Sequence, residues 1–279
     1  MIPFFAFLFG CIMGSFLNVV ILRLHTGRSL NGRSHCMSCG SQLRAIDLVP
    51  LFSFLVLRGR CRDCTSRISS RYFIVEVTTG ILFALIAAQF FAIPFLWALF
   101  SIVVALLVVV FVYDLRHTII PNEAVLLLTL CAAAFLSYQY VQGAGISLVY
   151  NIAAAVLASG IFATLWLVSR GRWIGLGDAK LMLPLGLFLS ASGTLSFIVL
   201  AFWIGTLYVG VVALTKTIAK RLVHNHFSLP RYTMRSEVPF GPFLIVGFFL
   251  VLLAHVDILT LTQSFADATT RLVYLWLLK

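Results

Sequence analysis

Gly175-Leu176-Gly177-Asp178-Ala179-Lys180 places a carboxylate between two glycines and a lysine, within a chain that is otherwise largely apolar. A charged side chain at the centre of a membrane helix costs about 2.5–3.5 kcal/mol on insertion scales, so an acid in such a segment is a candidate functional group. A second acid, Asp114, ends another apolar run in the same way. We therefore expect a membrane protein in which Asp114 and Asp178 meet at one membrane face and act together.

The composition is that of a multi-pass membrane protein. Of the 279 residues, 61% are hydrophobic and only 10% are charged, whereas a soluble domain is about half apolar and about a quarter charged. The length accommodates about eight transmembrane helices of roughly 20 residues and one small soluble insert. The apolar run over 1–22 has no basic segment before it and no small-residue cleavage site after it. It is therefore predicted to be an anchor helix and not a removed signal peptide.

The apolar runs predict an all-α fold with spans over 3–22, 73–92, 95–113, 122–141, 147–168, 179–192, 194–215 and 238–256. If the first span starts outside, eighteen of the twenty Lys and Arg residues lie on one side of the membrane. That asymmetry marks this side as cytoplasmic and places both aspartates at its face. The net charge of +11 then belongs to cytoplasmic loops, so we expect membrane lipid as a partner and no nucleic acid.

These spans divide the chain into four parts. We expect a first transmembrane helix over 1–22, a cytoplasmic insert over 23–72, and a transmembrane core that carries the two aspartates over 73–257. The remaining part is a tail over 258–279, whose mixed and partly apolar sequence favours a helix at the membrane interface.

The insert carries two C-x2-C motifs, separated by twenty-one residues, whose members are Cys36, Cys39, Cys61 and Cys64. Two such motifs are typical of a four-thiolate zinc site, and four protein ligands leave no open position, so the metal is expected to be structural. The insert is too small to bury much of a core, so zinc would contribute folding energy directly. Disulfide pairing is the alternative, and a reducing cytoplasm argues against it. Cys11 and Cys131 lie in apolar runs and are expected to behave as small hydrophobic residues.

Several polar and small residues in the first two spans are predicted to hold helices together. Gly10 and Gly14 form a small-xxx-small face for close helix packing. Asn18 lies one turn further on and could hydrogen-bond a neighbouring helix. Glu76 could reach the lipid headgroups, pair with an arginine of the insert or line a site. For both polar residues, a structural role and a site role stay open.

Each aspartate also has a purely structural interpretation. Asp114 could cap a loop or pair with Arg116, and Asp178 could accept backbone N–H bonds at the start of a helix. The glycines Gly175 and Gly177 remove side chains beside the acid, which permits unusual backbone angles and close approach of a substrate backbone. Together with Lys180 they are predicted to form a substrate-binding loop beside the catalytic acid.

Six motifs together resemble the bacterial prepilin peptidases, the type IV leader peptidases of the GxGD-type aspartyl protease family. They cover nearly the whole chain and are Gly14–Arg23, the paired cysteines with Leu57–Cys64, Ile68–Tyr72 before Glu76, Asp114-Leu-Arg with Ile120-Pro-Asn122, Gly175–Lys180 and Pro239–Phe243. The departures are small: the family often has proline where this chain has His25 and Met37. Both positions lie in the insert and not near the aspartates.

The resemblance implies a membrane-embedded aspartyl endopeptidase of the bacterial inner membrane with its active site facing the cytoplasm. Asp114 and Asp178 would remove the basic leader from type IV prepilins or pseudopilins. Many members also methylate the new N-terminus with S-adenosylmethionine, for which Asn18 and Glu76 are candidate residues beside their packing role. The chain has no nucleotide-binding fingerprint, so this cofactor rests on the resemblance alone. Two alternatives stay open: a peptidase without methyltransferase activity, and an ion- or proton-coupled transporter that uses the two aspartates.

Overall fold

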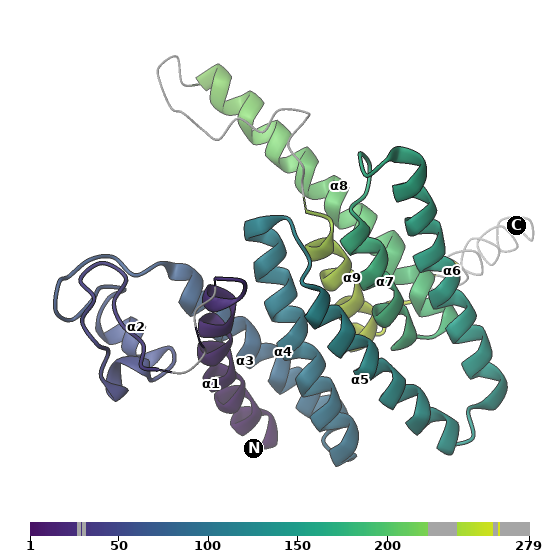
Figure 1. Ribbon diagram of the computed structural model, residues 1–279, viewed down its shortest axis with the longest axis horizontal. Coiled ribbons are helices and arrows are strands. Elements are labelled where there is room, and N and C mark those ends of the chain that lie inside the picture. Colours follow the sequence, from purple (N-terminus) through teal and green to yellow (C-terminus); the bar gives the residue numbers. More distant parts are fainter. Residues whose placement is uncertain (27–28, 30–31, 223–238, 259–261, 263–279) are drawn as a thin grey trace, which may run out of the picture. The chain divides into compact units, whose positions relative to one another are not determined.

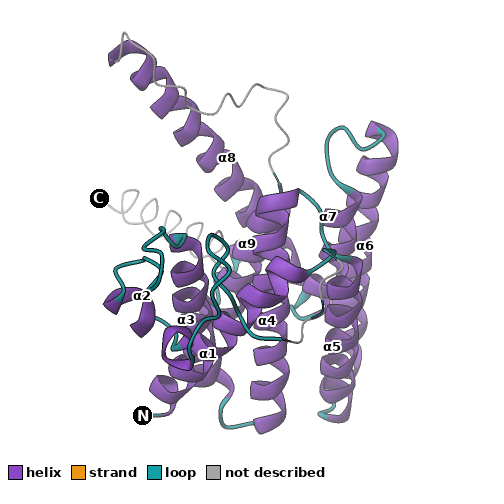
Figure 2. Ribbon diagram, turned by 60° about the vertical axis from the view of Figure 1, so that its left-hand side comes forward, coloured by secondary structure: helices purple, strands orange, loops and turns teal. Residues whose placement is uncertain are grey.

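The computed structural model describes residues 1–26, 29, 32–222, 239–258 and 262, so the predicted tail over 258–279 lies almost wholly outside the described residues. The described part is all-helical and has no strand, which confirms the predicted fold class (Figures 1 and 2). Its elements are α1 (Ile2–Arg23), the short 3-10 helix η1 (Ala45–Leu48), α2 (Phe52–Val56), α3 (Ser70–Phe90), α4 (Pro94–His117), α5 (Asn122–Val141), α6 (Gly145–Ser169), α7 (Leu176–Leu187), α8 (Ala191–Leu222) and α9 (Gly241–Ala254).

Six of these helices are long and apolar enough to cross a membrane, so the chain is a multi-pass membrane protein. They are α1, α3, α4, α5, α6 and the first 25 residues of α8. The other two predicted spans correspond to α7 and α9, which have only 12 and 14 residues. At about 1.5 Å per residue these two helices reach about 18 and 21 Å, short of the roughly 30 Å hydrocarbon core. The predicted count of eight spans therefore stays a prediction.

The chain forms two compact units, residues 1–113 and 114–279, which are described separately. In the first unit, α1 packs closely on α3 because glycines face each other across the contact. A Cβ atom added to Gly10 would lie 2.7 Å from the Cβ of Phe83, and one added to Gly80 would lie 2.6 Å from Cys11 Sγ. Gly14 lies as tightly against the backbone of Glu76, at 2.8 Å. The predicted small-residue face is therefore confirmed, and Cys11 is buried in it, as expected for a small hydrophobic residue.

In the second unit, the short helix α7 forms part of the core, in contact with α5, α6, α8 and α9. Two thirds of its residues are buried, among them Leu181, Met182 and Leu185. Gly186 lets α7 approach α6, because a Cβ atom there would lie 2.9 Å from the Cβ of Ala155. Gly247 does the same for α9 against α8, where the added atom would lie 2.6 Å from a backbone oxygen. A helix surrounded in this way can be shorter than the membrane is thick, since protein covers its ends.

The close α1–α3 contact predicts that a Gly→Ala substitution within it lowers the stability of the protein, whereas one at an open position on another helix does not. Gly10→Ala should lower the melting temperature of the purified protein in detergent, because overpacking a tight contact costs about 1–3 kcal/mol. Gly160→Ala on α6 is the matched control, since an added methyl group there meets nothing within 4 Å. Alanine gains about 1 kcal/mol over glycine in a helix, so this control should be neutral or slightly stabilising. Equal melting temperatures for the two variants would contradict the packing described here.

Candidate active site and metal centre

Asp178 occupies the first turn of α7. The helix begins after Gly175, whose backbone N–H donates to Asp178 Oδ2 at 3.3 Å, so the capping interpretation of this acid is confirmed. Gly175 has φ −71° and ψ 146°, an extended conformation that any residue adopts. The expectation of unusual backbone angles at this glycine is therefore wrong. The glycine instead provides space, because a Cβ atom there would lie 3.3 Å from the Asp178 carboxylate.

Asp114 lies in the last turn of α4. Its backbone carbonyl accepts from the N–H of Thr118 at 2.8 Å, and Thr118 ends the helix with a left-handed φ of 53°. The Asp114 side chain is only 3% exposed, and its Oδ2 has no hydrogen-bond partner in the part of the chain that the structure describes. Pairing with Arg116 is not observed there either, since Arg116 Nε is itself buried without a partner among the same residues.

The structure brings the two aspartates together at the start of α9. The backbone of Gly241 interacts with the carboxylates of both Asp114 and Asp178, and the charge of Asp114 acts on Asp178. A Cβ atom on Gly241 would lie 2.5 Å from Asp114 Oδ2, so only glycine leaves room for that carboxylate. Both acids are buried, with 3% and 7% of their surface exposed. Three helix ends that are far apart in sequence thus form one site with two carboxyl groups.

The residues around the pair hold the start of α7 against the start of α5. A Cβ atom on Gly177 would lie 3.1 Å from the Cβ of Ile120, so this glycine makes room for a side chain of the α4–α5 loop. Lys180 donates to the side-chain oxygen of Asn122 at 3.1 Å. The structure therefore assigns packing and positioning contacts to Gly177 and Lys180, and their substrate contacts stay a prediction.

Gly241 is the residue of this site that the sequence analysis missed. The stretch Pro239–Phe243 entered only as a motif that resembles a family's closing helix. A glycine between two prolines has no chemistry of its own, and its contact with the acids depends on the tertiary fold. The sequence held only an indirect sign of this contact. Gly241 and Pro242 stand at the start of an apolar run, and two other apolar runs have an aspartate at one end.

The four cysteines of the insert lie together. Their Sγ atoms all lie within 4.8 Å of one another, and all four thiols are free, so the disulfide alternative is not what the structure shows. Both motifs fold alike. The carbonyl of the first cysteine of each pair accepts from the N–H four residues later, at Gly40 (2.9 Å) and Thr65 (3.0 Å). Gly40 and Thr65 both adopt left-handed backbone angles, with φ of 72° and 56°.

Groups in and beside these turns favour the thiolate form of Cys36 and Cys64. The N–H groups of Cys39 and Ser38 lower the pKa of Cys36 to about 6. The Ser66 side chain and backbone lower the pKa of Cys64. The thiolate is the form that binds metals, and the four clustered cysteines could hold a metal ion.

The candidate residues Asn18 and Glu76 lie beside the insert in the first unit. Asn18 Nδ2 donates to the carbonyl oxygen of Tyr72 on α3 at 3.2 Å, so the predicted hydrogen bond to a neighbouring helix is confirmed. Glu76 is 9% exposed, and its Oε2 accepts from the backbone N–H of Leu51 at 2.9 Å. One alternative was that Glu76 pairs with an arginine of the insert. Glu76 does contact the insert, but through the backbone N–H of Leu51 and not through an arginine.

The fold and these sites define an all-helical, multi-pass membrane protein with two buried aspartates in one site and a four-cysteine insert. Residues 8–90 match the Bacterial Peptidase A24 N-terminal domain, and residues 101–210 match the Type IV leader peptidase family. The cysteines fall within the first match and both aspartates within the second. The chain belongs to the type IV leader peptidase family, which confirms the resemblance found in the sequence.

Curated relatives carry the name prepilin leader peptidase/N-methyltransferase. The relative from Bacillus subtilis (strain 168) is 31% identical over 252 residues, which cover 88% of this chain and 92% of the relative. The relative from Burkholderia pseudomallei (strain 1026b) is 31% identical, with 87% and 82% covered. The relative from Myxococcus xanthus (strain DK1622) is 34% identical over 76% of this chain, a match that spans only 63% of the relative's own length. No solved structure matches the chain significantly.

The cysteine cluster predicts that bound metal depends on its four thiols. Cys36→Ser and Cys61→Ser should each lose most of the metal that copurifies with the wild-type protein, because each change removes one soft ligand. Cys131→Ser is the matched control, since Cys131 lies in α5, outside the cluster. Elemental analysis of the purified proteins measures the metal. Metal content that is equal in all three variants would contradict this ligand set.

Proposed function

We propose that this protein removes the basic leader from type IV prepilins or pseudopilins and methylates the new N-terminus. Family membership and the names of the relatives support the reaction class. The observation that carries the proposal for the peptidase site is the meeting of Asp114 and Asp178 at the backbone of Gly241. Two acids in one buried site are the arrangement that aspartyl proteolysis requires.

In the proposed mechanism the two carboxyl groups hold one proton between them, because like charges in a desolvated site do not both ionise readily. The ionised group accepts a proton from a water molecule as the water attacks the carbonyl carbon of the scissile bond. The protonated group donates to the carbonyl oxygen. The pair titrates as a unit, so the two roles belong to the pair and not to one named residue.

The unpartnered oxygen of Asp114 supports this mechanism. Leaving a buried polar atom without a hydrogen bond costs about 1–3 kcal/mol, and Asp114 Oδ2 has no partner among the described residues. A water molecule or a protonated Asp178 would satisfy this oxygen, and both are parts of the proposed reaction. The Gly175 N–H holds Asp178 in place, which limits the search for the productive arrangement.

We place the protein in the bacterial inner membrane with the aspartates at the cytoplasmic face. The support is that eighteen of the twenty Lys and Arg residues lie in the loops on one side of the predicted spans or, for Lys180, directly beside one. A basic leader would stay in the cytoplasm, while the apolar helix that follows it would lie in the lipid against the protein. The basic residues are accounted for by this orientation, so we expect no nucleic acid partner.

We assign zinc to the cysteine cluster as a structural metal. Four thiolates at about 2.3 Å from a tetrahedral zinc ion lie roughly 3.8 Å apart, and Cys36 Sγ and Cys64 Sγ are 3.9 Å apart. Four sulfur ligands close the coordination sphere, so the ion would hold the two turns together and take no part in hydrolysis. For the second reaction S-adenosylmethionine would supply the methyl group, as the N-methyltransferase in the relatives' names suggests.

A transporter that uses the two aspartates is the alternative from another class. Family membership does not favour it. Ion flux into liposomes that is lost in Asp114→Asn, together with no cleavage of an added prepilin, would favour the transporter over the peptidase.

The paired acids predict that either Asp114→Asn or Asp178→Asn abolishes leader cleavage. Loss of a general acid or base costs typically about 10²–10⁴-fold in rate, and the double variant should be no worse than the single ones because the two act as a unit. Asp257→Asn is the matched control: its side chain accepts a hydrogen bond from Ser196, which an asparagine oxygen can also accept. Cleavage of a purified prepilin is followed by mass spectrometry. Normal processing by Asp178→Asn would exclude the mechanism.

Gly241 provides an independent prediction for the same site. Gly241→Ala should lower the cleavage rate severely, because its methyl group would occupy the space of Asp114 Oδ2. Gly210→Ala in α8 is the control, since nothing lies within 4 Å of an added methyl group there. Melting temperatures report whether either variant is simply misfolded. A folded Gly241→Ala protein with wild-type activity would show that the carboxylate does not need this space.

A further inference from the structure

The insert of the first unit exposes an apolar surface. Within residues 46–56, which cover most of η1 and all of α2, six large hydrophobic side chains are 42–63% exposed: Ile46, Leu48, Val49, Phe52, Leu55 and Val56. Because η1 and α2 contact each other, these residues belong to one part of the insert. Single exposed hydrophobic residues are ordinary on a protein, whereas a group of them marks a surface that a partner covers.

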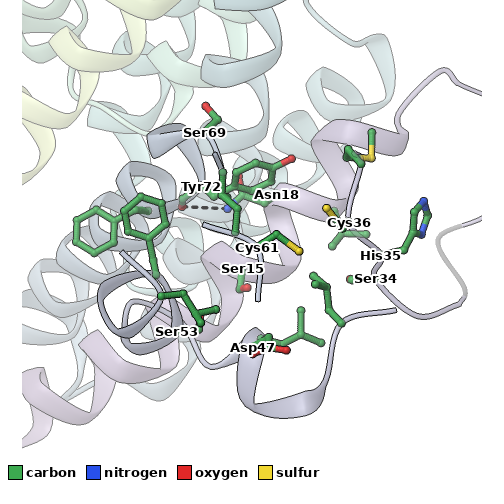
Figure 3. Close-up of a pocket in the computed structure, with 18 of the residues that line it drawn as sticks. Ser15, Asn18, Ser34, His35, Cys36, Asp47, Ser53, Cys61, Ser69 and Tyr72 are labelled. Atoms are coloured by element: carbon green, nitrogen blue, oxygen red, sulfur yellow. Dashed lines mark hydrogen bonds between the residues drawn. The ribbon is translucent and has the colours of Figure 1, made fainter. Parts of the chain in front are cut away.

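The short helix α2 has its polar residue turned inward. Ser53 and Phe54 line a cavity of about 410 Å³ between the insert and the ends of α1 and α3, and Figure 3 shows Ser53 among the residues that line it. Phe52, Leu55 and Val56 do not line the cavity and are 57–63% exposed. A helix that faces water carries polar residues on its outer side. The outer side of α2 is apolar, so its composition fits lipid better than water.

Two contacts fix α2 to the first two turns of α3, and Figures 1 and 2 both show α2 beside this helix. The ring of Phe54 stacks on that of Phe73 with 5.2 Å between the centroids, and the N–H of Leu51 donates to Glu76 Oε2 at 2.9 Å. At about 1.5 Å per residue, both partners lie within roughly 10 Å of the start of α3 at Ser70. The 21 residues of α3 are about the number that a membrane span needs, so its first turns lie at the membrane boundary and hold α2 there.

The apolar surface continues from the insert onto the membrane-spanning helices. Ile74 follows the stacked Phe73 in α3 and is 56% exposed. Phe16 of α1 is 51% exposed, and it lies near the same level because the neighbouring Gly14 packs against Glu76. Exposed apolar side chains on membrane-spanning helices face the acyl chains of the lipid. The exposed residues of the insert therefore adjoin a surface that lipid already covers.

Positive charge flanks the apolar stretch. Residues 23–72 contain nine arginines and no lysine, against two aspartates. Arg44 and Arg58 stand within two residues of the ends of the stretch, and both are exposed. The guanidinium group binds phosphate well, and anionic lipid attracts basic segments beside a membrane. An apolar surface with a basic border is the composition of a segment that lies in the membrane interface.

We infer that the insert docks on the membrane that the protein spans. The exposed apolar residues of 46–56 lie at the boundary between headgroups and acyl chains, and Arg44 and Arg58 contact the headgroups of anionic phospholipids. The attachment of α2 to α3, the apolar surface shared with the spanning helices and the flanking arginines all point to lipid as the covering partner. The inference does not depend on the proposed reactions. It replaces the expectation of a soluble insert with an insert that rests on lipid.

The test is photo-crosslinking of the full chain in nanodiscs of phosphatidylethanolamine and phosphatidylglycerol. The photoreactive residue p-benzoylphenylalanine replaces Phe52 or Leu55, and mass spectrometry of the irradiated protein measures attached lipid. Gln42, an exposed polar residue of the insert, is the control position, and Leu157 of α6, which is 66% exposed, is the benchmark for lipid contact. Positions 52 and 55 should give at least about tenfold more lipid adduct than position 42 and approach the yield at position 157.

Lipid composition tests the part of the arginines. When phosphatidylcholine replaces phosphatidylglycerol, the yield at positions 52 and 55 should fall about twofold or more, with no change at position 157. Melting temperature and metal content check the folding of each variant, and the change at Phe52 keeps an aromatic ring. The inference is overturned if folded variants at both positions give no more lipid adduct than position 42. It is also overturned if they crosslink to an added prepilin or to a second copy of the chain and not to lipid. Equal yields in both lipid mixtures would overturn the headgroup contacts of the arginines.

Discussion

The structure depends on how it accommodates two carboxyl groups in an apolar protein. A buried charge needs polar partners. In the second unit these are backbone groups: Asp178 accepts from the N–H of Gly175, and both acids contact the backbone of Gly241. This arrangement brings the starts of α7 and α9 to the end of α4, because free backbone N–H groups occur at helix starts and not inside a helix. Both α7 and α9 begin at the acids.

Glycine is what allows these helix ends to meet. Gly177 and Gly241 both face Ile120, with added Cβ atoms that would lie 3.1 and 3.2 Å from its side chain. The same device joins α1 to α3 through Gly10, Gly14 and Gly80. Helices in lipid gain no hydrophobic free energy by touching each other, so close van der Waals packing must stabilise their contacts. Small residues thus position both the aspartates and the wall of the cavity beside the insert.

The sequence predicted the properties that are local and missed those that depend on tertiary contacts. Apolar runs are a local signal, so the long helices fall where they were expected, and α5 was predicted with its observed ends. The start of α7 was misjudged by three residues because Gly175 and Asp178 form a cap that belongs to the helix. The cysteine turns were predicted since their spacing is itself the signal. Two contacts were not predicted: that of Gly241 with the acids and the hydrogen bond from Leu51 to Glu76. Each joins segments that are far apart in the sequence, and the spacing of apolar residues carries no information about which segments become neighbours.

The acids of this chain differ in which groups compensate their negative charge. This difference distinguishes acids with a structural role from acids with a role in the reaction. Asp47 is paired with Arg62 and needs nothing more. Asp114 and Asp178 balance each other only if a proton lies between them, and a shared proton is what acid–base catalysis uses. Glu76 accepts a hydrogen bond from the backbone N–H of Leu51, which joins α3 to the insert. A buried acid that the fold leaves uncompensated is costly to keep, and at the paired aspartates the proton that the proposed reaction uses is also the one that offsets this cost.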